Sequence, residues 1–571
     1  MSADRRDVNP CRKSLSARRR SALAPEALTP ERYIKMDVYR RGCLTGRVCR
    51  QWVGAWLLVA LAASTPGLDR HALAAAEPPR PRFFYNDDGD RTVFLLKGPF
   101  QRRQLNYPVD VLVGTGVTTL VFCANMGSDQ AYYPSRVASS LGWREVENTR
   151  RNARYTYFNR LREIGEMLRK EKIDLLGIVM RRAQQQGLEF VPSLRMNDTH
   201  FLNKVPPREH PLTGEFWMKN QDLTINGGAL DFSHQKVRDY RLGQIRELIE
   251  GYATDGFEMD FSRQPTLFPV GTGKDNSGLV TQMVRQARRW LDARSQDDGH
   301  RRFLIVRVPH TLDLCQHYGF DLGGWMKENL IDYVVPASPD RYFQFDIPLG
   351  AFLELARRTD SMCRVIAGPD SYRATPSMYR AGMSNYYAMG QRDTYLFNFF
   401  AARAEPRNYY PFDDADYALL RDLKSPLTLW GRPKHFLSAG WFPGRGLKLA
   451  AAGQPYHVDL YVGDDLPLAR RENILKTARL KMAVQGLSAE AVLEVRLNDQ
   501  LLPPASVLRD GDQFQIPLVD ILPVQGPNRV SVTASQLDAG APVTVTRVEM
   551  LVDYDLLGVT SNPSADSQSG P

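Results

Sequence analysis

The chain has 571 residues, of which 43% are hydrophobic and 24% are charged. This length and apolar fraction allow several folded domains and exclude a largely disordered or fibrous chain. The net charge of +10 is concentrated at the amino terminus, because residues 1–76 hold 14 basic and 6 acidic residues and leave 60 and 58 for the remainder. The body of the protein is almost neutral, so nucleic acid is not predicted as a partner.

Residues 1–76 are predicted to be an N-terminal extension and a signal peptide. A basic stretch precedes the apolar run Trp52–Ala63, and the small residues Ala74–Ala76 follow it. A basic region, an apolar segment of about 7–15 residues and an A-x-A site are typical of secretory signals. The run is shorter than the roughly 20 residues that span a bilayer. We expect cleavage after Ala76 and a secreted or periplasmic protein with no stable membrane span; an uncleaved anchor is the alternative, and Met36 is a second candidate start.

Residues 77–117 are predicted to form a β segment that caps the next domain. Residues 118–429 alternate short apolar runs with helical stretches such as Gln235–Tyr252, where apolar residues recur near the 3.6 period. Strands that alternate with helices predict a parallel sheet, and eight repeats fit a (β/α)8 TIM barrel. A doubly wound open sheet is the alternative. The predicted strands are Leu120–Ala124, Leu188–Leu194, Ala229–Phe232, Phe257–Phe261, Phe303–Val308, Ile331–Val335, Arg364–Ala367 and Thr394–Phe399.

The pattern of apolar residues in the sequence changes after the predicted barrel. Residues 430–556 hold short Val- and Leu-rich runs separated by turn-forming residues, which predicts an antiparallel β-sandwich accessory domain. Residues 557–571 are predicted to be a disordered tail. The body cysteines Cys123, Cys315 and Cys363 are too widely spaced for a disulfide framework or a zinc site, and they are predicted to be buried.

Two carboxylates stand on the fourth predicted strand. Alternation along Phe257–Phe261 directs Glu258 and Asp260 into the lumen of the barrel. A buried carboxylate must be hydrogen-bonded, paired or neutralised, and barrel active sites lie at the carboxyl ends of the strands. Asp260, at the exit of the strand, is therefore predicted to be catalytic. Glu258 is either a second catalytic candidate or a structural residue paired with Arg307.

Polar residues follow the other predicted strands and are expected at the same end of the barrel. Asp340 is a candidate second carboxylate, or else the Asp of a local turn. Asp198 with His200 is a weak metal motif, and no metal or other cofactor is predicted. The remaining candidates, all predicted to bind substrate, are Arg195, Asn197, Asp198, Arg263, His310, Tyr342 and Asp370.

Three segments carry a resemblance to a known family. They are Ser193–Asp198, Leu230–Phe232 with the helix that follows it, and Tyr252–Arg263, which contains Asp255-Gly256-Phe257-Glu258-Met259-Asp260-Phe261. These segments resemble the glycosyl-hydrolase-like family-ten barrels, a part of the wider TIM-barrel glycosidases. Members commonly have a His two residues before the strand-four Asp, where this chain has Glu258. The region from Val495 to Val530 resembles the β-sandwich domains attached to glycosidases.

The leading hypothesis is an exported glycoside hydrolase that acts on a poly- or oligosaccharide. Its mechanism uses two carboxyl groups, one as acid and one as nucleophile or base. Asp260 is assigned as nucleophile or base and Asp340 as general acid. Glu258 is the substitute candidate for either role. The runner-up is a carbohydrate-binding barrel without catalysis, and a third hypothesis is a metal-dependent hydrolase.

Arginines also follow three predicted strands, at Arg195, Arg263 and Arg341. The planar guanidinium suits carboxylate or sulfate groups, so an anionic glycan is one hypothesis for the substrate. The alternative is that each arginine pairs with Glu258, Asp198 or Asp340 and leaves no net field.

Overall fold

The structure is a computed structural model. It describes residues 80–89, 101–127, 130–144, 155–200, 202, 212–225, 228–337, 343–370, 374–399, 417–438, 447–448, 453–488, 491–535 and 543–556. The chain divides into two units, Met1–Pro79 and Arg80–Pro571. The first unit, with the predicted signal peptide, lies outside the described residues, as does the predicted tail. Among the helices described, none combines the length and apolar character that a membrane crossing requires.

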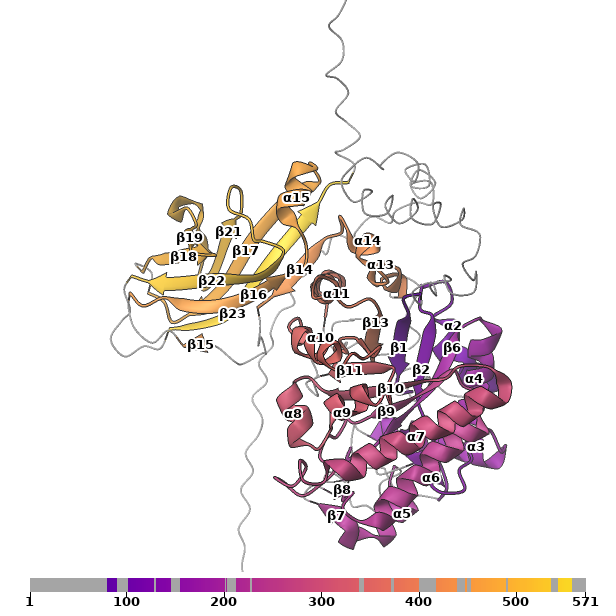
Figure 1. The fold of residues 1–571 in the computed structure, drawn as a ribbon. Coiled ribbons are helices and arrows are strands. Elements are labelled where there is room, and N and C mark those ends of the chain that lie inside the picture. Colours follow the sequence, from indigo (N-terminus) through magenta and orange to yellow (C-terminus); the bar gives the residue numbers. More distant parts are fainter. Residues whose placement is uncertain are drawn as a thin grey trace, which may run out of the picture. The chain divides into compact units, whose positions relative to one another are not determined.

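Eight parallel strands form one sheet, here called the barrel sheet (Figure 1). Its order is β12-β11-β10-β9-β6-β2-β1-β13, so strands that follow one another in the chain are neighbours and the last strand pairs with the first. The strands are β1 (Phe83–Asp87), β2 (Thr119–Cys123), β6 (Glu189–Arg195), β9 (Gly256–Asp260), β10 (Phe303–Pro309), β11 (Tyr333–Ala337), β12 (Arg364–Val365) and β13 (Thr394–Phe397). The predicted count of eight parallel strands is confirmed.

The barrel sheet is curled, although its ladder is open between β12 and β13. At that seam an isolated parallel bridge joins Asp370 to Phe397. Side chains from strands that are not neighbours meet on the concave face. Asn86 on β1 and Tyr395 on β13 both reach Glu258 on β9. These contacts across the sheet define an interior, called the lumen below.

Side-chain alternation separates the lumen from the outer core. Phe84, Ile305 and Tyr395 belong to a buried cluster that lines the lumen. Phe257, Met259 and their neighbours on the opposite face pack in the larger core against the helices. This alternation confirms that Glu258 and Asp260 point inward. The three body cysteines are buried and free, as predicted.

Helices follow most of the strands and cover the outer face of the barrel sheet (Figure 1). Two helices, rather than one, cover residues 155–185, and Lys172 adopts a positive φ of 52° between them. The helices are α2 (Tyr107–Asp110), α3 (Tyr155–Lys170), α4 (Leu175–Gln185), α5 (Glu215–Lys219), α6 (Gln235–Gly251), α7 (Ser277–Asp298), α8 (Leu312–His317), α9 (Leu322–Lys327), α10 (Leu349–Arg358), α11 (Pro376–Ala388), α13 (Leu420–Leu423) and α14 (Pro426–Leu429).

Two predictions about the strands are wrong. Residues 77–117 were expected to cap the barrel, but β1 (Phe83–Asp87) is a member of the barrel sheet between β13 and β2. Ala229–Phe232 was expected to be a barrel strand, but β8 (Ala229–Leu230) pairs antiparallel with β7 (Thr224–Ile225) in a separate sheet. The Asn197 side chain both accepts from the Leu230 amide and donates to its carbonyl. These bonds occupy backbone groups that a ladder would need.

The carboxyl-terminal region forms two antiparallel sheets, which agrees with the predicted sandwich. One sheet has the order β14-β23-β17-β21-β20, with β15 also paired to β23, and the other has the order β16-β22-β18-β19. The strands are β14 (Lys434–Leu437), β15 (Leu447–Lys448), β16 (Tyr456–Val462), β17 (Leu475–Gln485), β18 (Leu493–Leu497), β19 (Gln500–Leu501), β20 (Leu508–Asp510), β21 (Gln513–Pro517), β22 (Gly526–Ala534) and β23 (Thr544–Tyr554), with α15 (Leu466–Arg471) between β16 and β17.

Candidate functional site

Charged side chains from neighbouring strands meet at the carboxyl ends of the barrel sheet. Strand register aligns Arg195 on β6 with Asp260 on β9, and Asp260 with Arg307 on β10. One lumen layer deeper, Ser193 is aligned with Glu258. We call Arg195, Asp198, His200, Asp260, Arg263 and Arg307 the polar rim.

Asp260 is enclosed by donors. Its Oδ1 accepts from Arg307 Nη1 at 3.0 Å and from the amides of Ser262 and Arg263 at 3.0 and 3.1 Å. Its Oδ2 lies 3.1 Å from the same Arg307 nitrogen, and the residue is only 1% exposed. The Arg307 guanidinium in turn lies 3.9 Å from the centre of the Phe397 ring. Arg307 therefore fixes the Asp260 carboxylate at the exit of β9.

Glu258 lies directly below Asp260 and is fully buried. Asn86 Nδ2 and Ser193 Oγ donate to its Oε1 at 2.8 and 2.6 Å, and Tyr395 OH donates to Oε2 at 2.7 Å. Burial, followed by the charge of Asp260, raises the pKa of Glu258 to about 7. The alternative in which Glu258 pairs with Arg307 is not what the structure shows, because Arg307 is in register with Asp260 and forms its ion pair there.

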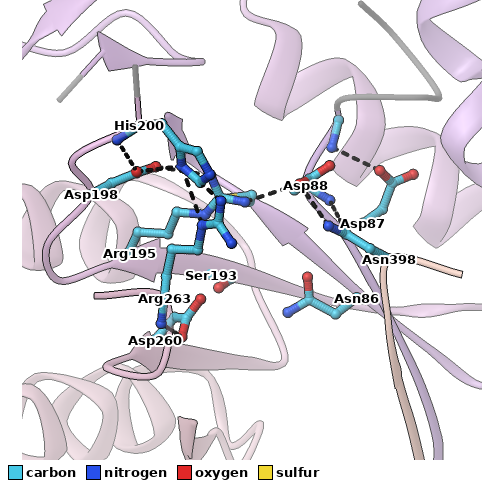
Figure 2. A network of polar contacts seen from close by, with 12 residues as sticks. Asn86, Asp87, Asp88, Ser193, Arg195, Asp198, His200, Asp260, Arg263 and Asn398 are labelled. Atoms are coloured by element: carbon cyan, nitrogen blue, oxygen red, sulfur yellow. Dashed lines mark hydrogen bonds and ion pairs between the residues drawn. The ribbon is translucent and has the colours of Figure 1, made fainter. Parts of the chain in front are cut away.

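Arg195 is held between two carboxylates (Figure 2). Its Nη1 donates to Asp198 Oδ2 at 2.9 Å and its Nη2 donates to Asp88 Oδ2 at 3.0 Å. Asn398 Nδ2 also donates to Asp88, at 2.8 Å. Burial opposes ionisation of Asp198, but His200 and Arg195 outweigh it and hold the pKa of Asp198 well below its usual range. The charge of Arg195 is therefore balanced by carboxylates of the protein. This agrees with the alternative in which the arginines pair with carboxylates of the protein and leave no net field.

His200 and Arg263 complete the polar rim (Figure 2). His200 Nδ1 lies 2.5 Å from Asp198 Oδ1, and the same nitrogen lies 2.9 Å from Nη2 and 3.2 Å from Nε of Arg263. Burial, together with the two nearby arginines, lowers the pKa of His200 despite the Asp198 carboxylate. The Arg263 side chain thus faces an imidazole where Arg195 faces carboxylates.

The remaining predicted residues differ in what they contact. Asn197 is buried, and besides Leu230 it donates to the Thr266 carbonyl at 3.1 Å, so its amide stabilises loop backbone. Asp370 is 7% exposed and bridges to β13 through its backbone. His310, just after β10, has a buried Nδ1 that finds no hydrogen-bond partner among the described residues. Asp340 and Tyr342 lie outside the described residues.

The first strand contributes site residues that the sequence reasoning missed. Asn86 contacts Glu258, and Asp88 pairs with Arg195. The signal in the sequence was the polar run Asn86-Asp87-Asp88 directly after three apolar residues. Polar residues at the carboxyl end of an apolar strand are typical of barrel active sites. Within the described ranges, no group of three or more His, Cys, Asp or Glu side chains is arranged to hold a metal ion.

Comparison with known proteins gives weak similarities. No family model matches the chain, and no curated protein matches it. Similar solved structures include a cycloisomaltooligosaccharide glucanotransferase from Paenibacillus sp. complexed with cycloisomaltoheptaose, at 10% identity and a TM-score of 0.31 over 82% of this chain. They also include alpha-L-fucosidase isoenzyme 2 from Paenibacillus thiaminolyticus, at 13% and 0.35 over 60%. A third is a GH36 alpha-galactosidase from Geobacillus stearothermophilus, at 12% and 0.30 over 80%.

This chain spans 57%, 48% and 55% of the lengths of those three proteins, respectively. At such identities and TM-scores, the similarities assign neither a family nor an activity to this chain.

Proposed function

We propose that the protein is an exported glycoside hydrolase whose substrate, a poly- or oligosaccharide, binds at the polar rim. Asp260 is the nucleophile or base and Asp340 is the general acid. Glu258 is the substitute candidate for either role. The observation that carries the proposal is the ion pair of Asp260 with Arg307 at the exit of β9. It places a fixed carboxylate where parallel barrels bind and transform their substrates.

The environments of the two lumen carboxyl groups support a two-carboxylate chemistry. Asp260 accepts hydrogen bonds from a guanidinium and two amides, whereas Glu258 has its pKa raised to about 7 by burial and by the Asp260 charge. Glu258 therefore holds a proton near neutral pH. Glycoside hydrolysis requires one carboxyl group that can donate a proton and a second that acts as nucleophile or base.

A non-catalytic carbohydrate-binding barrel is the second candidate. The observation in its favour is the enclosure of the carboxylates, since Asp260 is 1% exposed and Glu258 is fully buried. In that function Asp260 only neutralises Arg307, and the protein binds sugars without turnover.

Replacing Asp260 separates the two functions. Asn keeps the size of Asp but cannot act as a carboxylate at the anomeric carbon, so D260N is expected to lower kcat by about 10⁴-fold with little change in sugar binding. The measurement is the release of reducing ends from a polysaccharide panel, together with Tm. If Asp260 only neutralises Arg307, the variant instead loses about 3–5 kcal/mol of stability.

Asp393 provides a matched control. It is equally buried, at 1% exposure, and pairs with Arg364 at 2.7 Å, but it precedes β13 at the amino end of the barrel sheet. D393N is expected to lower Tm and to keep the turnover of each folded molecule. A D260N variant that stays folded and keeps its turnover excludes Asp260 as the catalytic group.

A further inference from the structure

The ion pairs of the polar rim leave one guanidinium without a carboxylate. Arg195 has two carboxylate partners, at 2.9 and 3.0 Å, and Arg307 has Asp260 at 3.0 Å. In the part of the chain that the structure describes, Arg263 has no carboxylate oxygen within 4.0 Å. The hydrogen bonds of its guanidinium go to His200.

His200 is a poor partner for this guanidinium. Its Nδ1 lies 2.5 Å from Asp198 Oδ1 and 2.9 Å from Arg263 Nη2. A protonated Nδ1 donates to Asp198 and then opposes the N–H groups of Arg263. An unprotonated Nδ1 accepts from Arg263 and then directs its lone pair at the Asp198 carboxylate. Neither form satisfies both neighbours, so an incoming anion competes for Arg263 against a weak acceptor.

The position of Arg263 makes its charge available at the end of the lumen. The residue is partly buried at the exit of β9, and burial followed by the charge of Arg195 lowers its pKa. A partly buried guanidinium that forms no ion pair with the described residues is costly to keep. A binding role accounts for this arrangement, because a bound oxyanion supplies the missing charge and accepts from the planar fork.

A buried polar atom without a hydrogen-bond partner among the described residues lies at the next strand exit. Asp260 and Arg307 are in register on β9 and β10, and Arg263 and His310 each follow three residues later. Within the described residues, the buried Nδ1 of His310 has no hydrogen-bond partner. Native proteins pair nearly all buried polar atoms, so this nitrogen, at the strand exit next to that of Arg263, is available to hydrogen-bond a ligand.

We propose that Arg263, with His310 at the exit of the adjacent strand, forms an oxyanion subsite that selects glycans carrying acidic groups. The group is a carboxylate, as in a uronic acid, or a sulfate ester, since both match the guanidinium fork. The proposal rests on the function proposed above, and it adds the substrate class. Arg195 and Arg307 do not share this role, because the carboxylates of the protein already occupy them.

The subsite is tested by anion-dependent thermal stability of the full chain. Wild type, R263Q and R263K are melted in sodium glucuronate, sodium sulfate and sodium chloride at equal ionic strength, and in glucose. Ligands that bind the native state raise Tm by mass action. We expect glucuronate or sulfate to raise the wild-type Tm above its value in chloride, and R263Q to lose that rise. R263K keeps the charge without the fork and is expected to bind about tenfold more weakly.

Two further readouts separate binding from a structural role. Without added anion, R263Q is expected to melt no earlier than wild type, because it removes a partly buried charge that forms no ion pair with the described residues; a structural role predicts a lower Tm. R285Q is the control, since Arg285 forms an exposed pair with Glu328 at 2.7 Å and lies outside the site. Its anion-induced rise in Tm is expected to equal that of wild type.

The two anions identify the acidic group. A rise confined to glucuronate assigns a carboxylate, and a rise confined to sulfate assigns a sulfate ester. Equal Tm rises in wild type and R263Q with both anions overturn the subsite. Failure of hydrolysis is read separately, from the polysaccharide panel: Arg263-dependent anion binding without turnover of any glycan contradicts the hydrolase and leaves the subsite standing.

Discussion

Glu258 is the residue whose surroundings most directly predict a pH effect. Its carboxyl group is fully buried among Asn86, Ser193 and Tyr395, and its pKa is raised from 4.5 to about 7. A raised carboxyl pKa means that the folded state binds the proton more tightly than the unfolded state does. Stability from this group is therefore greatest below about pH 4.5 and falls as pH rises through about 7.

The E258Q variant tests this linkage. A shift from 4.5 to about 7 corresponds to about 3 kcal/mol. Gln is nearly isosteric and has no charge to bury, so E258Q is expected to be more stable than wild type at pH 8 by about 1–3 kcal/mol. The advantage is expected to vanish near pH 4.5. Urea denaturation at both pH values measures the difference, and a variant equally destabilised at both contradicts the raised pKa.

Sequence alternation predicted which side chains enter the lumen but not their partners. Period-two alternation follows from strand geometry alone, so Glu258 and Asp260 could be assigned to one face. Whether Arg307 meets Glu258 or Asp260 depends on the register of β9 against β10, which is set by long-range packing. For the same reason the hydrogen bonds that Asp88 accepts from Arg195 and from Asn398, which are far apart in the chain, could not be predicted.

At the scale of the element, β9 and β10 approach very closely at the amino end. A Cβ added at Gly256 would lie 2.6 Å from the carbonyl oxygen of Phe303 and 2.7 Å from the aromatic ring of the same residue. Both atoms belong to the neighbouring strand, so the backbone itself would have to move. Gly256 therefore permits the strand spacing that aligns Asp260 with Arg307 farther along.

The G256A variant is expected to destabilise the fold by about 1–3 kcal/mol, the usual cost of overpacking. Gly278 on α7 is the control, because a Cβ there meets nothing within 4 Å. G278A is expected to be neutral or slightly stabilising, since Ala favours a helix. The midpoint and slope of urea unfolding are the measurement. A G256A variant as stable as wild type would show that the strands can separate freely.

Elements with strong local signals were predictable, and those defined by pairing were not. Gln235–Tyr252 was assigned as a helix from its 3.6 period and α6 spans Gln235–Gly251. Phe83–Asp87 has three apolar residues followed by turn-forming ones, so its membership of the sheet became visible only through pairing with β13 and β2. The apolar run at Ala229 was predicted to be a barrel strand and is not one, because Asn197 hydrogen-bonds the backbone groups of Leu230.

For the whole molecule, the position of β1 predicts where the chain can be shortened. A chain that begins at Glu77, the expected product of signal cleavage, keeps β1 and is expected to unfold at the same temperature as the full chain. A chain that begins at residue 118 lacks β1, exposes the edges of β2 and β13, and loses Asn86 from the lumen. It is expected to show no cooperative transition in calorimetry.

These two chains also decide between the two roles considered for residues 77–117. If the segment were a dispensable cap, the chain that begins at residue 118 would melt cooperatively close to the full-length temperature. Mass measurement of secreted material independently checks cleavage after Ala76.

The pairing of the first barrel strand with the last imposes an order in time on synthesis. Phe83 is aligned with Thr394, so β1 leaves the ribosome long before its partner exists. At about 5–20 residues per second, that delay is about 15–60 seconds. Throughout it, an aromatic strand presents an unpaired edge that favours contact with other nascent chains. Export in an unfolded state, with a chaperone covering Phe83–Asp87, would protect this edge during the delay, and β1 would then pair with β13 on the far side of the membrane.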